Sequence, residues 1–143
     1  MPTLLAAAVV APLLALASAL SGLPVPADAP PALVLLTDQA FGERLGWTEN
    51  HAIGVTSLST GYIYVYPGWR EGDGDTCVLV HELTHWLQVV NRVEIHPIAR
   101  LEVQAYDVTA KCYARRGEKQ RAIVALHQKA AAEKEAASDQ LSR

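Results

Sequence analysis

Residues 81–85 read His-Glu-Leu-Thr-His, with two histidines four residues apart and a glutamate directly after the first. Four residues make just over one turn of an α-helix, so His81 and His85 project from the same face, about 6 Å apart along the axis. Two imidazoles at this spacing can bind one zinc ion, and the carboxylate of Glu82 beside them can act as a general base. The alternative is an amphipathic helix that carries two histidines and no metal.

A helix is predicted around this motif, from about Thr76 to Val90. Its polar positions recur every three or four residues along one face: Cys77, His81, Thr84, His85 and Gln88. Apolar side chains cover most of the remaining surface, so this helix should be buried at the centre of the fold. The short connection Asn91–His96 leads to a second helix, which opens at Pro97 and ends at Gly117. So short a connection makes the two helices antiparallel neighbours.

Two histidines do not complete a catalytic zinc site, which usually has three protein ligands. Glu102 is the candidate for the third, because it lies 17 residues after His85 and one turn inside the second helix. In an antiparallel pair this position lies close to His85. Glu94 and His96, in the connection, compete for the role. Asp107 also competes, although it points some 140° round the helix from Glu102. The alternative for Glu102 is a solvated surface charge.

The motif and the helix after it together resemble a known group. HELTH with a downstream helical Glu, in Leu-Glu-Val-Gln-Ala-Tyr (residues 101–106), is similar to the gluzincin branch of the zincin metallopeptidases. The resemblance covers roughly residues 32–117. It implies that Glu82 is the general base and later the proton donor in the hydrolysis of a peptide or protein substrate. It also implies a Zn²⁺ cofactor held by three residues: His81, His85 and Glu102.

The chain departs from that group in two ways. Many gluzincins have an Asp four residues after the Glu ligand, where it orients a motif histidine, and here that position is Tyr106. The larger peptidases also have a second, helical domain that closes the cleft, and we expect no such domain in a chain of 143 residues. The chain is therefore most similar to the minimal bacterial zincin-like domains.

Short strands are predicted ahead of the motif helix. Ala32–Thr37 is an apolar run typical of a buried strand. Asp38–Gly46 could form a short helix, and Trp47–Thr60 a loop or a weak strand. Gly61–Tyr66 (GYIYVY) alternates in the manner of a strand, with three tyrosines on one side. In zincins a strand before the motif helix runs antiparallel to the extended substrate, and Gly61–Tyr66 fits that place.

Two tyrosines are candidates for contact with the substrate or with an oxyanion. Tyr64 lies on the predicted strand, and Tyr106 lies one turn after Glu102 on the same helix face. Packing is the alternative for both side chains. The elements together predict an α+β fold, a small zincin-like domain in which an active-site helix hairpin packs on a short, few-stranded sheet.

The two cysteines, Cys77 and Cys112, fall on the two predicted helices. Cys77 lies about 12 Å from His85 towards the start of the first helix, and Cys112 about 15 Å from Glu102 towards the end of the second. These directions coincide in an antiparallel pair, so the thiols can meet at one end while the ligands meet at the other. An oxidising compartment favours a disulfide there. Two buried free thiols and metal ligation are the alternatives.

The beginning of the chain resembles an export signal. Leu4–Leu20 is an apolar run rich in Ala and Leu, broken by Pro12, and small residues that suit cleavage occur at 17–19 and 27–29. No basic residue precedes Arg44, which is unusual for such a signal. We expect an exported protein, in a bacterial periplasm or outside the cell, and an uncleaved segment would anchor it in the membrane.

The chain is long enough for one folded domain. Residues 1–29 are the predicted signal peptide and Pro-rich linker, residues 30–117 the zincin-like metal-binding domain, and residues 118–143 an Ala-rich C-terminal helix or tail. Ile123, Val124 and Leu126 are the expected packing residues of that helix. The net charge is −3, so the composition argues against nucleic acid as a partner. The oligomeric state does not follow from the sequence.

The sequence therefore predicts a zinc-dependent hydrolase, a metallopeptidase that cleaves peptide bonds with Glu82 as general base. The alternative from another class is a catalytically silent, zinc-stabilised binding or interaction module, in which Glu82 is retained only for geometry. A third hypothesis is a helical domain without metal. The Glu82→Gln variant separates the first two, since only an enzyme would lose hydrolysis while it kept its zinc.

Overall fold

The computed structural model describes residues 3–38, 40, 43, 54–66, 69 and 75–141, and it confirms the predicted α+β class. The elements are β1 (Thr3–Leu4), α1 (Ala7–Ser21), β2 (Val34–Leu36), β3 (Gly54–Thr56), β4 (Ile63–Val65), α3 (Asp75–Val90), α4 (Ile98–Arg115) and α5 (Lys119–Leu141). The short helix predicted over residues 38–46 lies largely outside the described residues.

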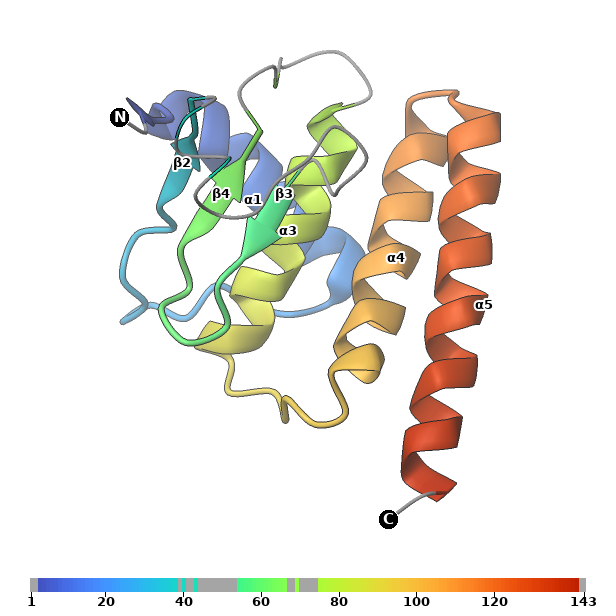
Figure 1. Cartoon of the computed structure of the whole chain (residues 1–143). Coiled ribbons are helices and arrows are strands. Elements are labelled where there is room, and N and C mark those ends of the chain that lie inside the picture. Colours follow the sequence, from blue (N-terminus) through green and yellow to red (C-terminus); the bar gives the residue numbers. More distant parts are fainter. Residues whose placement is uncertain are drawn as a thin grey trace.

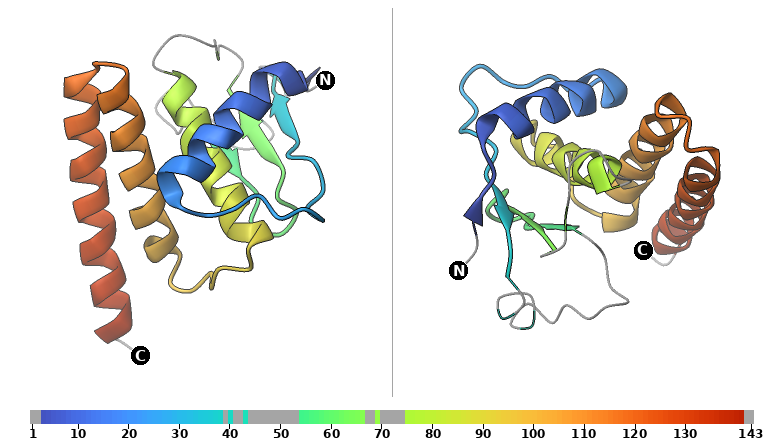
Figure 2. Two further views of the ribbon diagram at one scale, coloured as in Figure 1. Left: turned by 180° about the vertical axis from the view of Figure 1, so that it is seen from behind. Right: turned by 90° about the horizontal axis from the view of Figure 1, so that it is seen from above.

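The motif helix α3 lies at the centre of the molecule, as its apolar surface predicts. It packs against α1 on one side and against the sheet on the other, and α4 runs alongside it (Figure 1 and Figure 2). Leu79, Leu83 and Leu87 of α3 are fully buried. The connection of residues 91–97 turns the chain back, so α4 is antiparallel to α3 as predicted (Figure 1).

The sheet is small and mixed, with the strand order β1-β2-β4-β3. β4 pairs in parallel with β2, where Ile63 lies opposite Val34, and antiparallel with β3, where Tyr64 lies opposite Val55. Ile63 and Val65 are fully buried while Tyr64 is half-buried, which is the alternation that the sequence predicted.

The prediction that Gly61–Tyr66 is the strand beside an extended substrate is wrong. β4, from the GYIYVY stretch, is hydrogen-bonded on both edges, so it has no free edge for an extended substrate. The preceding stretch, predicted as a loop or weak strand, folds back on β4 through a turn at Gly61, whose φ of 76° suits glycine. β3 is therefore the edge strand at this end of the sheet, and it contacts the motif helix α3.

The N-terminal segment packs against the rest of the described chain. Val10, Leu13 and Ala17 of α1 are buried against α3, and β1 pairs antiparallel with β2. The helix ends at Gly22, which has a φ of 77°. Within the described residues, no helix combines the length and the hydropathy needed to cross a bilayer.

The C-terminal helix α5 packs along α4 through small side chains. Its buried residues are Ala122, Ala125 and Ala132. The packing predicted for Ile123, Val124 and Leu126 is wrong, since these side chains are 47–57% exposed. The alanine face lets the two helices approach closely, and Figure 1 shows α5 running alongside α4.

Candidate metal centre

The structure brings the two motif histidines and Glu102 together. α3 presents both imidazoles on one face, and the first turns of α4 bring the carboxylate beside them. One ligand atom from each of the three residues lies within 4.8 Å of the others. The Nε2 atom of His85 contacts Glu102 Oε1, and Nε2 of His81 lies 3.7 Å from Glu102 Oε2. Two imidazole nitrogens and one carboxylate form a donor set that suits zinc and leaves a position open.

The competing residues lie elsewhere. Glu94 is exposed in the connection before α4. Asp107 binds two lysines, Lys111 at 2.8 Å and Lys129 of α5 at 3.0 Å. Within the described part of the chain, His81, His85 and Glu102 form the only group of three or more such side chains that could hold a metal ion. The exposed His127 takes no part in it; His51 lies outside the described residues.

The charges at the cluster favour a negative Glu102. Burial opposes ionisation of this carboxyl group, but its hydrogen bonds and charge interactions with His81 and His85 outweigh that effect and hold its pKa well below the usual range. Burial likewise opposes protonation of His85, but the contact with Glu102 and the charge of Glu82 raise its pKa. Glu102 is therefore ionised, and a carboxyl group must be ionised to bind a metal.

Glu82 lies beside the three candidate ligands but does not belong to the cluster. Its side chain is buried, and its Oε2 lies 3.9 Å from His81 Nε2. The hydroxyl of Thr56, on β3, lies 2.8 Å from the other carboxylate oxygen and can donate to it. A Cβ atom built on Gly54 of the same strand would lie only 2.9 Å from Glu82 Cγ. β3 thus packs directly against the motif carboxylate.

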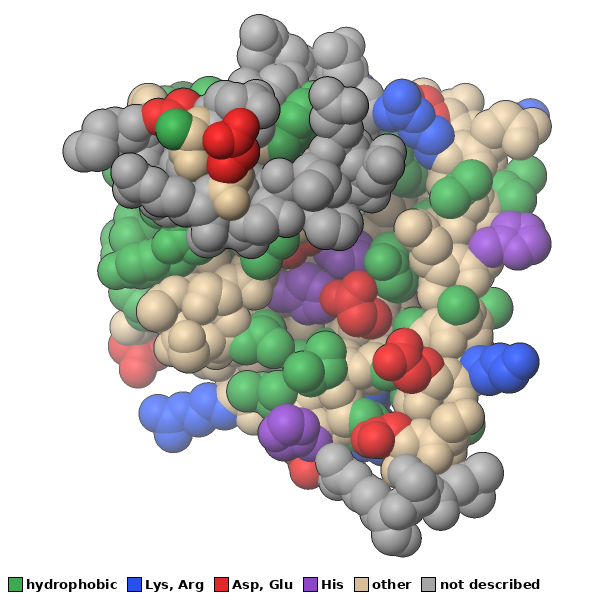
Figure 3. Space-filling view, viewed as in Figure 1, with side chains coloured by type: hydrophobic (Ala, Val, Ile, Leu, Met, Phe, Trp, Pro, Cys, Tyr) green, Lys and Arg blue, Asp and Glu red, His purple; other side chains and the backbone are tan. Residues whose placement is uncertain are grey.

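The cluster opens into a cleft of about 260 Å³. In Figure 3, histidine and acidic side chains gather in a hollow near the middle of the displayed face. The described residues that line the cleft are Gly54, Val55, Thr56, Leu58, His81, Glu82, His85, Ile98, Leu101, Glu102 and Tyr106. The wall combines apolar side chains, such as those of Val55, Leu58 and Leu101, with the polar groups of the cluster and its neighbours.

The two candidate tyrosines occupy different places. Tyr106 lines the cleft, and its ring centroid lies 4.7 Å from that of His81. Burial, followed by the charge of Glu102, raises the pKa of Tyr106 to about 12, so its hydroxyl keeps its proton at neutral pH. Tyr64 is half-buried on the central strand β4 and is not among the described residues that line the cleft.

Cys77 and Cys112 form a disulfide between α3 and α4, with Cα atoms 5.7 Å apart. Both residues are almost completely buried. Cys77 lies at the start of α3 and Cys112 near the end of α4, away from the metal-binding end of the pair. The predicted meeting of the thiols at one end of the hairpin is confirmed.

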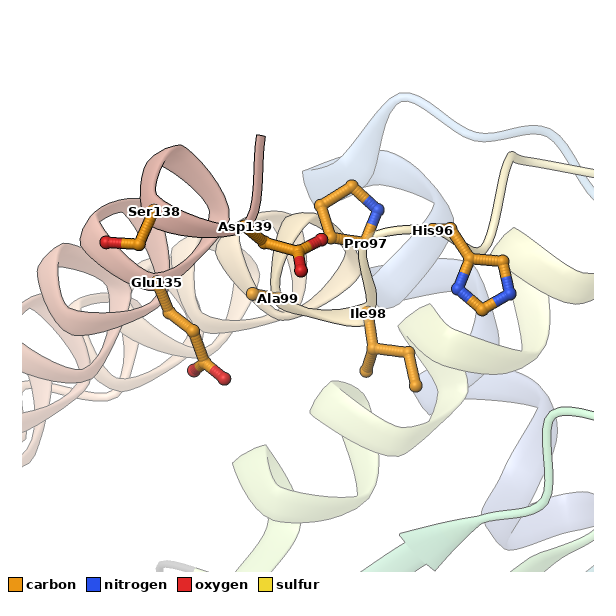
Figure 4. A pocket seen from close by; sticks show the side chains of 7 residues that line it. All are labelled: His96, Pro97, Ile98, Ala99, Glu135, Ser138 and Asp139. Carbon is orange, nitrogen blue, oxygen red and sulfur yellow. The ribbon is translucent and has the colours of Figure 1, made fainter. Parts of the chain in front are cut away.

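A second hollow, of about 500 Å³, lies where the connection before α4 meets the end of α5. It contains His96, Glu135 and Asp139, but Figure 4 shows the ring of His96 on the far side of the hollow from Glu135. These titratable groups do not converge, and within the described residues they do not form a potential metal site. Ile98 borders both this hollow and the cleft.

Sequence reasoning missed the residues that surround the cluster. Thr56 lies 26 residues before Glu82 on a separate strand, and no spacing rule connects the two positions. Thr109 bonds His81 and lies 28 residues after that histidine. The register that pairs Cys77 with Cys112 also places Thr109 opposite His81, and this signal could have found it. Gln88 was placed on the ligand face of the helix, but nothing in the sequence indicated its partners.

Comparisons with known proteins assign no family or function to this chain. No model of a known protein family matches this chain, and no curated protein or solved structure does either. The geometry of the cluster is therefore the evidence on which a function must rest.

Proposed function

We propose that this protein is a zinc-dependent hydrolase that cleaves a peptide bond or a related amide. The observation that carries the proposal is the position of Glu82. Its buried carboxylate lies beside the His81–His85–Glu102 cluster without belonging to it, and Thr56 binds one of its two oxygens. A purely structural metal site has no need of a second carboxylate that is not a ligand in this position.

The residues of the cleft can take separate roles in the hydrolysis. When bound, zinc supplies Lewis acidity that polarises the scissile carbonyl and makes water a better nucleophile. Glu82 accepts the proton of the attacking water through the oxygen that Thr56 does not bind, and then passes it to the leaving nitrogen. The protonated hydroxyl of Tyr106 lines the same cleft and can donate to the developing oxyanion.

Zinc content and peptide hydrolysis, measured on two carboxylate variants, test the proposal. Glu82→Gln should keep its zinc and lose activity by a factor of about 10² to 10⁴, because only the proton transfer is removed. Glu102→Gln should first weaken zinc binding and lose activity as a consequence. A broad mixture of peptides serves as substrate, and Glu94→Gln, which changes an exposed carboxylate outside the cluster, is the matched control.

The competing hypothesis of a zinc-stabilised binding module gives a different result. The parent, Glu82→Gln and Glu94→Gln would then bind zinc equally well and Glu102→Gln would bind it more weakly, but none of the four proteins would hydrolyse any peptide in the mixture. Loss of zinc from Glu82→Gln, together with intact zinc and activity in Glu102→Gln, would reverse the assigned roles of base and ligand.

We also propose that the protein is exported. The buried disulfide between Cys77 and Cys112 supports an oxidising compartment, where such bonds persist. In cells that express the full chain, the protein should be found in the periplasm or the medium with both thiols resistant to alkylation. The mass of the recovered chain then reports whether residues 1–29 have been removed. Recovery of reduced protein from the cytoplasm alone would contradict export.

A further inference from the structure

Each motif histidine is held at the ring nitrogen that faces away from Glu102. Nδ1 of His81 lies 2.9 Å from the hydroxyl of Thr109, and Nδ1 of His85 lies 2.8 Å from Oε1 of Gln88. Both partners are themselves buried, Gln88 at 1% exposure and Thr109 at 5%. Buried polar groups of this kind cannot exchange their partners for water, so the direction of each hydrogen bond can be deduced from the network.

The direction of the first bond follows from the surroundings of Thr109. Its hydroxyl lies 2.7 Å from the main-chain carbonyl of Ala105, which can only accept. A hydroxyl has one proton, and here that proton goes to the carbonyl. Towards His81, Thr109 can therefore only accept, so Nδ1 of His81 must carry the proton. The lone pair of the neutral ring then lies on Nε2.

The direction of the second bond follows from the surroundings of Gln88. Its amide nitrogen lies 3.0 Å from the main-chain carbonyl of Leu101 and 2.9 Å from Oε1 of Gln104. The carbonyl fixes which end of the amide is nitrogen, because an oxygen there would meet another acceptor. The Oε1 end therefore faces His85 and can only accept. The nitrogen of Gln104 in turn lies 3.3 Å from the carbonyl of Ser21, which fixes that amide as well.

We propose that Gln88 and Thr109 are positioning residues that hold both motif histidines in the Nδ1–H tautomer, with both Nε2 lone pairs presented to the metal. The proposal rests on the metal site of the proposed function. Position 106 holds Tyr, where an Asp that orients a motif histidine was expected. Thr109 and Gln88 take that orienting role here. Gln88 does more than orient a ring, since its bond to Leu101 ties α3 to the residue that precedes Glu102.

The first measurement is zinc affinity, determined by competition with a chelator. Thr109→Val and Gln88→Met remove the accepting groups at nearly constant shape, and each should weaken zinc binding roughly 10- to 100-fold. Thr109→Ser keeps the hydroxyl and should bind zinc within about twofold of the parent. The matched control is Thr84→Val, because Thr84 is also fully buried on α3 but donates only to Val80 of its own helix.

The second measurement separates positioning from a general loss of packing. Long-range ¹⁵N–¹H spectra of the zinc-loaded protein show which ring nitrogen of each histidine carries the proton and how fast that proton exchanges with water. Both rings should be Nδ1–H, with slowly exchanging protons, in the parent and in Thr84→Val. Thr109→Val should shift the Nδ1–H signal of His81 alone and speed its exchange, and Gln88→Met should do the same for His85 alone. A residue that served only to fill space would leave both signals unchanged.

The outcomes separate this proposal from the proposed function. Unchanged zinc affinity in Thr109→Val and Gln88→Met, or an Nε2–H pattern in the parent, would overturn the positioning role even if hydrolysis were observed. The expected affinities and tautomers in a protein that hydrolyses nothing would overturn the enzyme and leave the positioning role standing. If Gln88→Met does not fold, the pair Thr109→Val and Thr109→Ser decides the matter alone.

Discussion

The central helix α3 is held by two other helices in different ways. α4 is tied to it by a buried disulfide at one end and by the contact of Glu102 with His85 at the other. α1 rests on the opposite side through the apolar side chains of Val10, Leu13 and Ala17. One neighbour is fixed by bonds at both ends, and the other chiefly by the exclusion of water from a shared surface.

These two modes of packing separate the parts of the chain that the candidate site requires from those that only cover it. Every candidate metal ligand lies on α3 or α4, and α1 contributes none of them. The N-terminal segment approaches the site at the carbonyl of Ser21, which Gln104 contacts. Removal of residues 1–29 would therefore take apolar cover from α3 while it left the metal-binding residues in place.

The largest expected effect comes from breaking the covalent tie between α3 and α4. The disulfide closes a loop with a sequence separation of 35 residues. The Cys77→Ala/Cys112→Ala variant should lose about 4 kcal/mol of unfolding free energy, because its unfolded chain regains the freedom that the loop restricts. Urea unfolding of zinc-free protein measures the difference. A loss of less than about 1 kcal/mol would mean that packing, and not the bond, holds the two helices together.

A smaller effect is expected on the side of α1. Leu13 is buried against the core, and Leu13→Ala in the full-length chain should lower the unfolding free energy by about 3 kcal/mol, through lost burial and the cavity left behind. The control is Ala15→Ser, at an exposed position of the same helix, which should change the unfolding free energy by less than about 0.5 kcal/mol. Equal stabilities for the two variants would show that α1 does not pack against α3 in solution.

The smallest effect is expected at the outer side of α4. Burial disfavours the charge of Asp107, but Lys111 and Lys129 outweigh it and lower the pKa of this carboxyl group. A lowered pKa stabilises the fold above the pKa of the unfolded chain, about 3.9, and this stabilisation is lost as the pH falls through the lower folded value. Asp107→Asn should therefore cost less than about 1 kcal/mol at neutral pH.

The pH dependence of this last variant supplies its own control. The stabilities of Asp107→Asn and the parent should converge as the pH falls through the lowered pKa of the folded state, because both side chains are neutral below that value. Glu133→Gln, at an exposed position of α5, should follow the parent at every pH. A difference that persists in acid would assign the effect to the shape of the side chain instead of its charge.

Local periodicity explains which features could be predicted from the sequence. The spacing of His81 and His85 and the short connection to the helix of Glu102 determine their meeting, and the same geometry predicted the disulfide. The contact of Thr56 could not be predicted, because it joins a strand to the motif helix and no helical or strand period relates the two positions. Thr109 lies about one turn before Cys112, so the register of the hairpin places it opposite His81, but that register does not give the direction of the hydrogen bond. The run of residues 4–20 was ambiguous for another reason, since Ala and Leu suit an export signal and a packed helix equally.

The close approach of Gly54 to Glu82 has a consequence for sequence variation at the site. The φ of Gly54 is not in the left-handed region, so the backbone there would accept alanine, and glycine is needed only for clearance. One added methyl group would displace the motif carboxylate while every charged and hydrogen-bonding group of the site remained in the chain. Position 54 thus limits where the Glu82 side chain can lie. A substitution there would disable the site although every functional group of the site remained.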